Sequence, residues 1–377
     1  MAHEGVSRRR FLQDVAAGST GAALGTMPLA GSSSAAAPAD GLAPVTMESY
    51  PLAMPGAGAA LDHVKITTRS GIPEEYQKQI RAVSSGVELK ICESAEEFHR
   101  EIADTQAIYG GFSVEDLKAA KQLKWIQYTA AGVEHILSPE LVQSPVVLTN
   151  MQRIYTPAIS ETAIGLMLAL AHGINRYAVQ TKDHVWKQLE GLYDISDMTL
   201  GMVGLGGMGT DTAYRAHYGF GMKVLAVDPK PLPKPEFVAE LHSVDWLPKM
   251  VPQVDILMSA APHTRETEGM FNESIFRAMK PSALFINTSR GKLVDTPALV
   301  RALKEGWIAG AGLDVAYKEP LPADESLWSA GNVIITCHTS GWTPRTIGRQ
   351  MALFTENIRR YVNALPLLNV VDKVRGY

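Results

Sequence analysis

Four ionisable side chains follow apolar runs in the second half of the chain. Arg290 comes after "LFINTS", Asp314 and Glu319 lie in "GAGLDVAYKEPLP", and His338 lies in "VIITCHTSG". The carboxyl ends of strands in an open parallel sheet line one crevice. If the apolar runs are such strands, these side chains converge although they lie far apart in the sequence.

An arginine, a histidine and a glutamate together supply what the hydride reduction of a 2-keto acid requires from a protein. A guanidinium holds and polarises the substrate oxygens, and an imidazole donates a proton to the carbonyl. A glutamate bonded to the imidazole fixes its tautomer and favours its charged form. Each residue alone also has an ordinary interpretation, as a solvated rim charge, a loop acid or a turn histidine. The combination favours catalysis. The other histidines, such as His63, His172 and His263, lack this context and are predicted to be structural.

A glycine-rich loop precedes these residues. The stretch "MVGLGGMG" places Gly204, Gly206 and Gly209 after an apolar run and before a helical pattern. Such glycines permit a tight turn, close approach of a pyrophosphate and close helix–strand packing. Asp228 ends the next apolar run, where a carboxylate suits a ribose diol and repels a 2′-phosphate. The loop therefore predicts a dinucleotide site that favours NAD over NADP, although nearby Lys230 weakens the preference.

Alternating apolar and amphipathic segments must position these residues. The chain from Asp62 onward shows strand patterns at 63–68 and 87–91 and helix patterns at 73–83 and 94–102. This alternation predicts a parallel sheet with helices on both faces. A long helix is expected from Ile159 to Val185. A second series follows, with six strands at 200–204, 223–227, 254–259, 283–287, 308–313 and 333–336, and a last helix at 346–363.

The composition excludes several classes of protein. The chain has 377 residues, 46% hydrophobic and 20% charged, with a net charge of −4 and no basic stripe, so a nucleic-acid partner is not expected. No apolar run reaches the roughly 20 residues that span a bilayer. The two cysteines, Cys92 and Cys337, form no disulfide framework, and no paired His/Cys spacing indicates a metal site.

The first 40 residues differ from the rest. The motif "SRRRFL" precedes a mildly apolar stretch rich in alanine and glycine, with a small-residue cleavage site at Ala37-Pro38-Ala39. Residues 1–40 are therefore interpreted as a twin-arginine-type signal peptide, and 41–60 as a linker. The expected location is periplasmic or secreted. If 1–40 is instead a disordered tail, the protein is cytoplasmic.

From about residue 62 to 377 the sequence resembles the D-isomer-specific 2-hydroxyacid dehydrogenase family. The resemblance depends on "GMVGLGGMG", "NTSRGKLVD", "GAGLDVAYKEPLP" and "HTSG", in that order. It implies an α/β protein with two doubly wound domains, in which a Rossmann cofactor domain is inserted into a flavodoxin-like substrate domain. The implied boundaries are 61–155 with 342–377 for the substrate domain and 156–341 for the NAD-binding domain.

The resemblance also implies roles for individual residues. Arg290 binds the substrate carboxylate and keto oxygen, and His338, paired with Glu319, acts as acid and base. Asp228 holds the adenosine ribose, and Asp314 faces the nicotinamide. Cofactor contacts are expected at Gly204, Gly206, Gly207, Met208, Gly209, Pro262, Thr267, Thr288 and Ser289, and substrate contacts at the backbone amides of Ala131, Gly132 and Val133. Two departures are Cys337, where proline commonly stands, and Glu134, where aspartate is frequent.

Several functions stay open within this resemblance. The leading one is interconversion of a 2-keto acid and a D-2-hydroxy acid with NAD(H). Alternatives are glyoxylate or hydroxypyruvate reduction, phosphoglycerate oxidation and phosphite oxidation. A non-catalytic NAD-sensing interaction protein is also conceivable, but the complete Arg290, Glu319 and His338 set counts against it. Glu319 also argues against formate dehydrogenases, which use glutamine there. The family implies a homodimer formed through the cofactor domain, with 184–188 in the arm.

Overall fold

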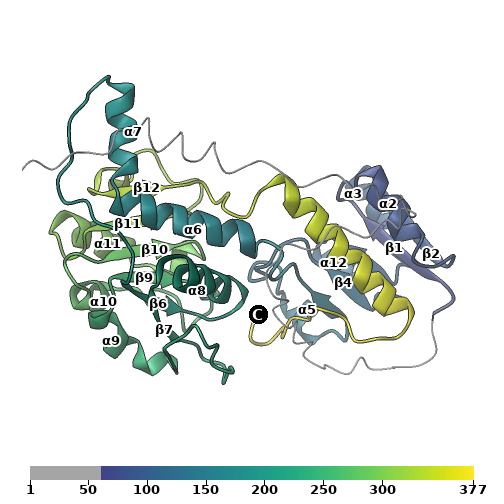
Figure 1. Cartoon of the computed structure of the whole chain (residues 1–377). Coiled ribbons are helices and arrows are strands. Elements are labelled where there is room, and N and C mark those ends of the chain that lie inside the picture. The colour runs from purple at the N-terminus through teal and green to yellow at the C-terminus, as the bar shows by residue number, and fades with distance from the viewer. Residues whose placement is uncertain (1–60) are drawn as a thin grey trace, which may run out of the picture. The chain divides into compact units, whose positions relative to one another are not determined.

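The computed structural model describes residues 61–377, which contain two parallel sheets (Figure 1). The described residues fall within one compact unit, Glu48–Tyr377. The predicted signal peptide (1–40) and linker (41–60) lie outside the described residues. The predicted α/β class with two doubly wound sheets is confirmed.

The first sheet has five parallel strands in the order β2-β1-β3-β4-β5, which is the flavodoxin-like order. Its core strand β1, "VKITT", is buried along its whole length although Lys65, Thr67 and Thr68 are polar. Its strands are β1 (Val64–Thr68), β2 (Val87–Ile91), β3 (Ala107–Tyr109), β4 (Trp125–Gln127) and β5 (Val147–Thr149), and its connecting helices are α2 (Glu74–Arg81), α3 (Ala95–Glu101), α4 (Val114–Ala119) and α5 (Pro139–Gln143).

The last helix of the chain packs on this first sheet. Helix α12 (Pro344–Val362) lies beside α2 in Figure 1, and its Phe354 ring stacks on that of Tyr109 with centroids 4.2 Å apart. Buried Asn357 donates from Nδ2 to Oε1 of Gln127 at 2.9 Å. The chain thus returns to its first core after the second sheet, as an inserted domain requires. The boundaries at 155/156 and 341/342 stay predictions.

The second sheet has seven parallel strands in the order β12-β11-β10-β9-β6-β7-β8. Chain order reverses between β6 and β9, which is the switch point at which such sheets bind ligands. The strands are β6 (Thr199–Val203), β7 (Lys223–Val227), β8 (Glu240–His242), β9 (Ile256–Ser259), β10 (Leu284–Asn287), β11 (Gly310–Leu313) and β12 (Val333–Ile335). The predicted count of six strands is wrong because β8, a three-residue edge strand without buried residues, has no apolar pattern.

Helices cover both faces of this sheet. The α-helices are α6 (Thr156–Ala171), α7 (Ile174–Lys182), α8 (Gly207–Phe220), α9 (Leu247–Met250), α10 (Glu273–Ala278) and α11 (Thr296–Lys304), with short 3₁₀ turns η1 (Val244–Trp246), η2 (Val251–Gln253), η3 (Gly291–Leu293) and η4 (Ser326–Ser329). Helix α6 contacts α8, β10 and β11, and residues of this helix join the core beneath β6. Helix α6 therefore supports the part of the sheet that leads into the glycine-rich loop.

The predicted continuous helix from Ile159 to Val185 is wrong. Two helices, α6 and α7, meet there at a bend of 71°. Gly173 stands between them at φ 62°, a left-handed conformation that glycine adopts without steric cost and that ends a helix. Apolar periodicity continues across the break and therefore hides it. The arm segment 184–188 follows α7, and its Trp186 is fully exposed.

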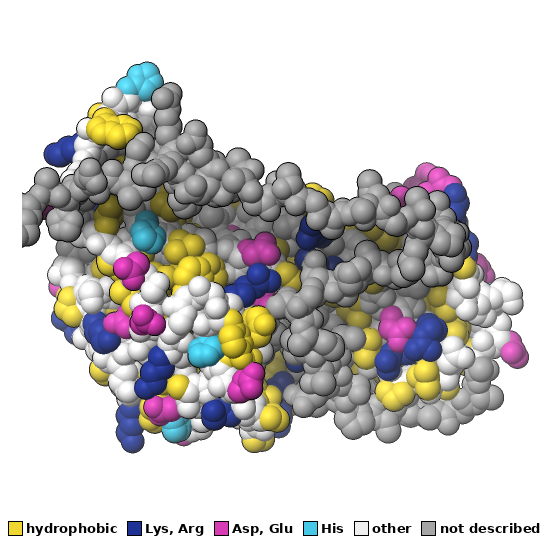
Figure 2. Space-filling model, in the orientation of Figure 1, with side chains coloured by type: hydrophobic (Ala, Val, Ile, Leu, Met, Phe, Trp, Pro, Cys, Tyr) yellow, Lys and Arg dark blue, Asp and Glu magenta, His cyan; other side chains and the backbone are white. Residues whose placement is uncertain are grey.

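The surface carries charges of both signs. On the face drawn in Figure 2, basic and acidic side chains are interspersed over the second sheet and its helices. A charged ligand is therefore attracted by the local charges of a site more than by a field of one sign. Within residues 61–377, no single helix is long and apolar enough to cross a bilayer, and only the bent pair of α6 and α7 passes on combined length and composition.

Candidate functional site

A pocket of about 560 Å³ lies where the carboxyl end of the second sheet meets the loop after β4. It brings together Arg290, Glu319 and His338, the three predicted catalytic residues. Predicted site residues Ala131, Gly132 and Thr288 also line it. The further lining residues, which the sequence analysis did not assign to the site, are Ala130, Glu134, His135, Tyr155, Ile159, His263, Gly291, Lys292, Ala316, Tyr317, Ser340, Gly341 and Trp342.

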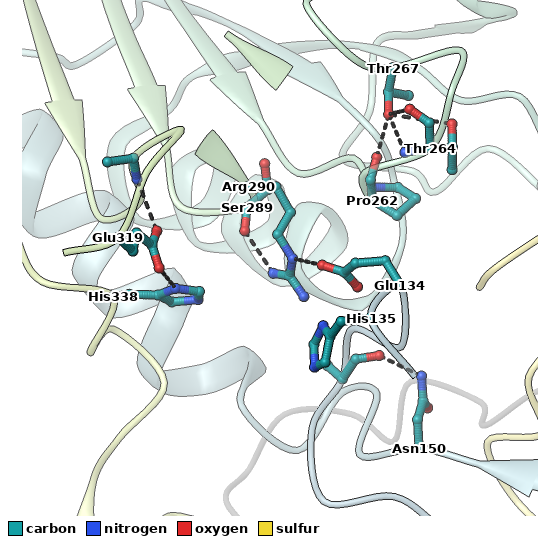
Figure 3. A network of polar contacts seen from close by, with 12 residues as sticks. Glu134, His135, Asn150, Pro262, Thr264, Thr267, Ser289, Arg290, Glu319 and His338 are labelled. Carbon is teal, nitrogen blue, oxygen red and sulfur yellow. Dashed lines mark hydrogen bonds and ion pairs between the residues drawn. The ribbon is translucent and has the colours of Figure 1, made fainter. Parts of the chain in front are cut away.

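His338 and Glu319 form a hydrogen-bonded pair. His338 Nδ1 lies 2.7 Å from Glu319 Oε2, and Glu319 Oε1 accepts from the backbone amide of Ala316 at 3.0 Å (Figure 3). An ionised carboxylate only accepts, so Nδ1 carries the proton and Nε2 is left for a substrate. His338 has φ 55°, a costly conformation for a residue with a Cβ, and such strain concentrates at functional sites.

Asp314 holds the loop that carries His338. Its carboxylate accepts from the Thr336 hydroxyl at 2.5 Å and from the amides of Thr339 and Ser340 at 3.1 and 3.2 Å. Its carbonyl accepts from the amide of His338 at 2.7 Å. The side chain is 1% exposed. The structure therefore places Asp314 beneath the loop, with its carboxylate already satisfied, and its predicted position facing the nicotinamide stays untested.

Arg290 crosses from the second sheet to the loop after β4. Its Nε donates to Glu134 Oε1 at 2.5 Å, and its Nη1 donates to the carbonyl of Ser289 at 2.8 Å (Figure 3). A Cβ on Gly132 would collide with Nη2, so only glycine admits the guanidinium at this depth. Two neighbours, Gly132 and Glu134, therefore bound the space in which an anion can reach the guanidinium.

The charge of Glu134 is secured by Arg290. Burial alone would raise the pKa of Glu134, but the nearby Arg290 charge and its hydrogen bond outweigh burial and hold that pKa below its usual range. Glu134 is consequently ionised at neutral pH and cancels part of the positive charge of the pocket. In the sequence, Glu134 stands out only as a departure from a family pattern. Nothing in the sequence indicates that it pairs with Arg290, which follows a strand of the other sheet.

The turn after β10 is organised by side-chain hydrogen bonds. Asn287 Nδ2 donates to the carbonyl of Arg290 at 2.9 Å, and Asn287 Oδ1 accepts from the amide and hydroxyl of Ser289. The Ser289 hydroxyl also lies 2.7 Å from that of Ser259 and is buried. Thr288 lines the pocket beside Met208, with its hydroxyl 3.6 Å from the sulfur. Ser289 therefore stabilises the turn, whereas Thr288 faces the site.

The predicted substrate loop is held from behind. The carbonyl of Ala131 accepts from Asn150 Nδ2 at 2.6 Å, and the amide of Met151 donates to the carbonyl of Ala130. Val133 is 1% exposed and its side chain belongs to the core of the first sheet. Ala131 and Gly132 line the pocket, whereas Val133 anchors the loop. His263, predicted to be structural, also lines the pocket.

The glycine-rich loop lies at the end of β6, apart from this pocket, and it fits the phosphates of a dinucleotide. Gly204 has φ 93°, and a Cβ there would lie 2.9 Å from Ala260. A Cβ on Gly209 would collide with the carbonyl of Gly204, whereas the space above Gly206 is open. A Cβ on Gly207, the first residue of α8, would lie 2.7 Å from Arg153. The loop thus allows a bulky anion to approach the start of α8.

Asp228 stands at the end of β7 beside this loop. Its carboxylate accepts from the amide of Leu205 at 2.8 Å and from that of Lys230 at 2.9 Å. The Lys230 ammonium lies 4.5 Å from the ring centre of Tyr377, and burial lowers the pKa of Lys230. An acid and a lysine therefore lie together where the ribose of a dinucleotide is expected. The contact with Tyr377 could not be read from the sequence.

The loop after β9 carries the remaining predicted cofactor residues. The Thr267 hydroxyl donates to the carbonyl of Pro262 at 2.7 Å and accepts from the amide of Thr264 at 2.8 Å (Figure 3). Thr267 thus closes a turn that fixes Pro262. Among residues 61–377, no group of three or more His, Cys, Asp and Glu side chains is arranged to hold a metal ion.

Comparisons with known proteins identify the family that this chain resembles. The sequence profile of the NAD-binding domain of D-isomer specific 2-hydroxyacid dehydrogenases matches residues 164–340. The glyoxylate reductase of Thermococcus onnurineus is 35% identical over 299 residues, 74% of this chain and 87% of the relative. That of Thermofilum pendens is 34% identical over 274 residues, 70% of this chain and 80% of the relative.

Solved structures of similar fold come from the same family. A D-isomer specific 2-hydroxyacid dehydrogenase family protein from Aeromonas salmonicida has a TM-score of 0.73 at 28% identity, over 82% of this chain and 99% of its own. The NADPH-dependent glyoxylate/hydroxypyruvate reductase of Sinorhizobium meliloti, in complex with NADP and sulfate, has a TM-score of 0.71 at 27% identity, over 83% of this chain and 100% of its own.

The range matched by the profile contains Arg290, Glu319 and His338, and the two solved relatives cover 82% and 83% of this chain. This chain belongs to the D-isomer specific 2-hydroxyacid dehydrogenase family and is an oxidoreductase that acts on a CH–OH group, interconverting a 2-hydroxy acid and a 2-keto acid by hydride transfer.

Proposed function

We propose that the pocket around Arg290 is the active site and that His338 is its acid and base. The observation that supports this most directly is the 2.7 Å pair of His338 and Glu319 in one pocket with Arg290. When bound, a nicotinamide dinucleotide supplies or accepts the hydride. The protein's own residues must then hold the carboxylate, polarise the keto oxygen and move one proton.

Each of these tasks has a candidate in the pocket. The Arg290 guanidinium binds the substrate carboxylate and keto oxygen, together with the amides of the Ala131–Gly132 loop. His338 gives its Nε2 proton to the keto oxygen in reduction and takes the hydroxyl proton in oxidation. Glu319 keeps Nδ1 protonated and stabilises the imidazolium. Glu134 fixes the direction in which the guanidinium points.

The cofactor that we propose is NAD(H), with Asp228 accepting from the ribose hydroxyls. In support, a carboxylate at this position disfavours a 2′-phosphate. Four of the similar solved structures contain NADPH or NADP, among them the Sinorhizobium enzyme, and Lys230 beside Asp228 would attract a phosphate. We assign the ribose to Asp228 because its carboxylate bonds the glycine-rich loop directly.

Glyoxylate or hydroxypyruvate is the best supported alternative substrate, because the similar curated relatives are named glyoxylate reductases. Phosphoglycerate or phosphite oxidation requires a site for a dianion, and Glu134 opposes a second negative charge near Arg290. A non-catalytic NAD-sensing protein would not need the His338–Glu319 pair.

The quaternary structure and location are also proposals. A homodimer is supported by apolar exposure along α7 and the segment after it, where Ile174, Val179 and Trp186 are 54%, 59% and 103% exposed.

Residues 1–40 support export of the folded protein by a twin-arginine pathway, in which case Arg8→Lys with Arg9→Lys should retain it in the cytoplasm. The substrate domain is proposed as 61–155 with 342–377, and the NAD-binding domain as 156–341.

Replacing Arg290 tests substrate binding. Arg290→Ala should lower kcat/KM for every 2-keto acid by about 10²- to 10³-fold, because the carboxylate and keto oxygen lose their charged donor. A panel of 2-keto acids with NADH, followed by absorbance, measures this. Glu134→Gln is the matched variant: it leaves the guanidinium in place and should alter KM more than kcat. Turnover of no acid by the wild type would refute the proposed function.

Replacing His338 tests the proton transfer. His338→Gln should lower kcat about 10²- to 10⁴-fold while NADH still binds, because only the acid is removed. Glu319→Gln should also lower kcat, since an amide does not stabilise the imidazolium. An unchanged kcat in His338→Gln would eliminate its role as acid.

Replacing Asp228 tests the cofactor preference. The wild type should show a higher kcat/KM with NADH than with NADPH, and Asp228→Ser should reverse or remove that ratio, because repulsion of the 2′-phosphate is lost. Steady-state rates with both cofactors give the ratio, and NADH fluorescence titration gives binding. A wild-type preference for NADPH would contradict the proposal.

A further inference from the structure

Two large aromatic side chains stand exposed at the mouth of the pocket. Tyr317 is 48% and Trp342 is 66% exposed, and both line the cavity. They lie two residues before Glu319 and four after His338 in the chain, so the loops that carry the proposed acid–base pair also carry them. Exposed aromatic surface that lines a cavity with a few converging polar groups is characteristic of ligand-binding sites.

Tyr155 forms a third aromatic wall, and it is fixed. Its hydroxyl donates to the carbonyl of Thr129 at 2.6 Å and accepts from Gln350 Nε2 at 2.6 Å. Burial raises the pKa of Tyr155, so this hydroxyl keeps its proton, which it donates to the carbonyl of Thr129. Its ring centre lies 6.2 Å from that of Trp342, at an angle of 59°.

Glycine allows this aromatic wall to form. A Cβ on Gly341 would lie 2.9 Å from the Tyr155 ring, so the chain between Ser340 and Trp342 approaches the ring closely only because residue 341 has no side chain. Ile159, one turn further along α6, adds an aliphatic surface to the same pocket. The wall is therefore part of the packed structure and does not depend on a movable side chain alone.

Glyoxylate has no side chain that could use this surface. Its carboxylate and carbonyl would contact Arg290 and His338 and leave Tyr155, Tyr317 and Trp342 uncovered. The cavity has a volume of about 560 Å³, and all three aromatic side chains line it. Covering the remaining apolar surface would be favourable because it removes that surface from water.

We propose that the preferred substrate is a 2-keto acid, or its 2-hydroxy acid, with an aromatic or bulky apolar side chain that packs against Tyr155, Tyr317 and Trp342. This inference rests on the proposed function of Arg290 and His338 and adds the substrate class. Ring–ring contact is most favourable in offset or edge-on arrangements, and the inclined Tyr155 and Trp342 rings offer both.

The charges of the pocket agree with a single carboxylate on the substrate. Arg290 is partly neutralised by Glu134, so a second acidic group near it meets a carboxylate. Lys292 also lines the pocket and is exposed. An acidic side chain bound by Lys292 is the competing arrangement, and a dicarboxylic 2-keto acid distinguishes it.

The test compares kcat/KM for phenylpyruvate, glyoxylate and 2-oxoglutarate, with the cofactor that the wild type uses. We expect phenylpyruvate to exceed glyoxylate by about tenfold or more, and Trp342→Ala to lower that ratio about tenfold. Trp342→Phe should keep most of the ratio because it keeps a ring. Trp328→Ala is the matched control: Trp328 is 50% exposed, lies outside the pocket and should leave the ratio unchanged.

A second measurement does not depend on turnover. 3-Phenylpropanoate, which has no keto group, should inhibit glyoxylate reduction at a concentration about tenfold lower than propanoate does, and Trp342→Ala should remove this difference. Equal inhibition by both acids, a glyoxylate preference that Trp342→Ala does not alter, or a 2-oxoglutarate preference lost in Lys292→Ala would each overturn the inference while leaving the proposed function intact. Turnover of no 2-keto acid by the wild type would overturn both.

Discussion

The ion pair of Arg290 and Glu134 is the contact on which the geometry of the site depends. The guanidinium comes from the end of β10 and the carboxylate from the loop after β4, so the pair ties the carboxyl end of one sheet to a loop of the other. Both side chains are about one third exposed, and such pairs contribute little to the free energy of unfolding. The value of the pair is positional: it holds the guanidinium at the pocket, and a side chain in place of Gly132 would displace it.

The proposed acid–base pair is positioned in a different way. His338 adopts a left-handed backbone conformation that its own preferences oppose, and four hydrogen bonds that Asp314 accepts from residues 336–340 offset that cost. Because Asp314 directly follows β11, a rigid strand fixes the imidazole although the residue itself lies in a loop. Asp314 thus has a structural explanation that is independent of any cofactor contact, which a motif alone does not provide.

Topology explains how much the sequence could predict. Apolar runs separated by helical patterns predict parallel strands, and parallel strands bring their carboxyl ends to one edge; the meeting of Arg290, Glu319 and His338 follows from that rule. Contacts that depend on side-chain direction across loops do not follow from it. The Glu134 pair, the Tyr377 ring beside Lys230 and the placement of His263 in the pocket are of this kind. The break at Gly173 was missed because apolar periodicity continues across it, and the edge strand β8 was missed because none of its residues is buried.

Fixed and exposed loop residues therefore contribute differently to the chemistry of this site. The groups that any 2-keto acid would need, a guanidinium, an imidazole and backbone amides, stand in loops that hydrogen bonds from Asn287, to Asp314 and from Asn150 hold in place. Tyr317 and Trp342 stand in the loops between these points, and Trp342 lies directly before Thr343 and Pro344, which begin α12. Because α12 packs in the core of the first sheet, the loop is anchored at both ends while its side chain stays exposed. A change of side chain at position 317 or 342 can thus alter the substrate without disturbing Arg290 or His338, and this separation allows one fold to serve many 2-hydroxy acids.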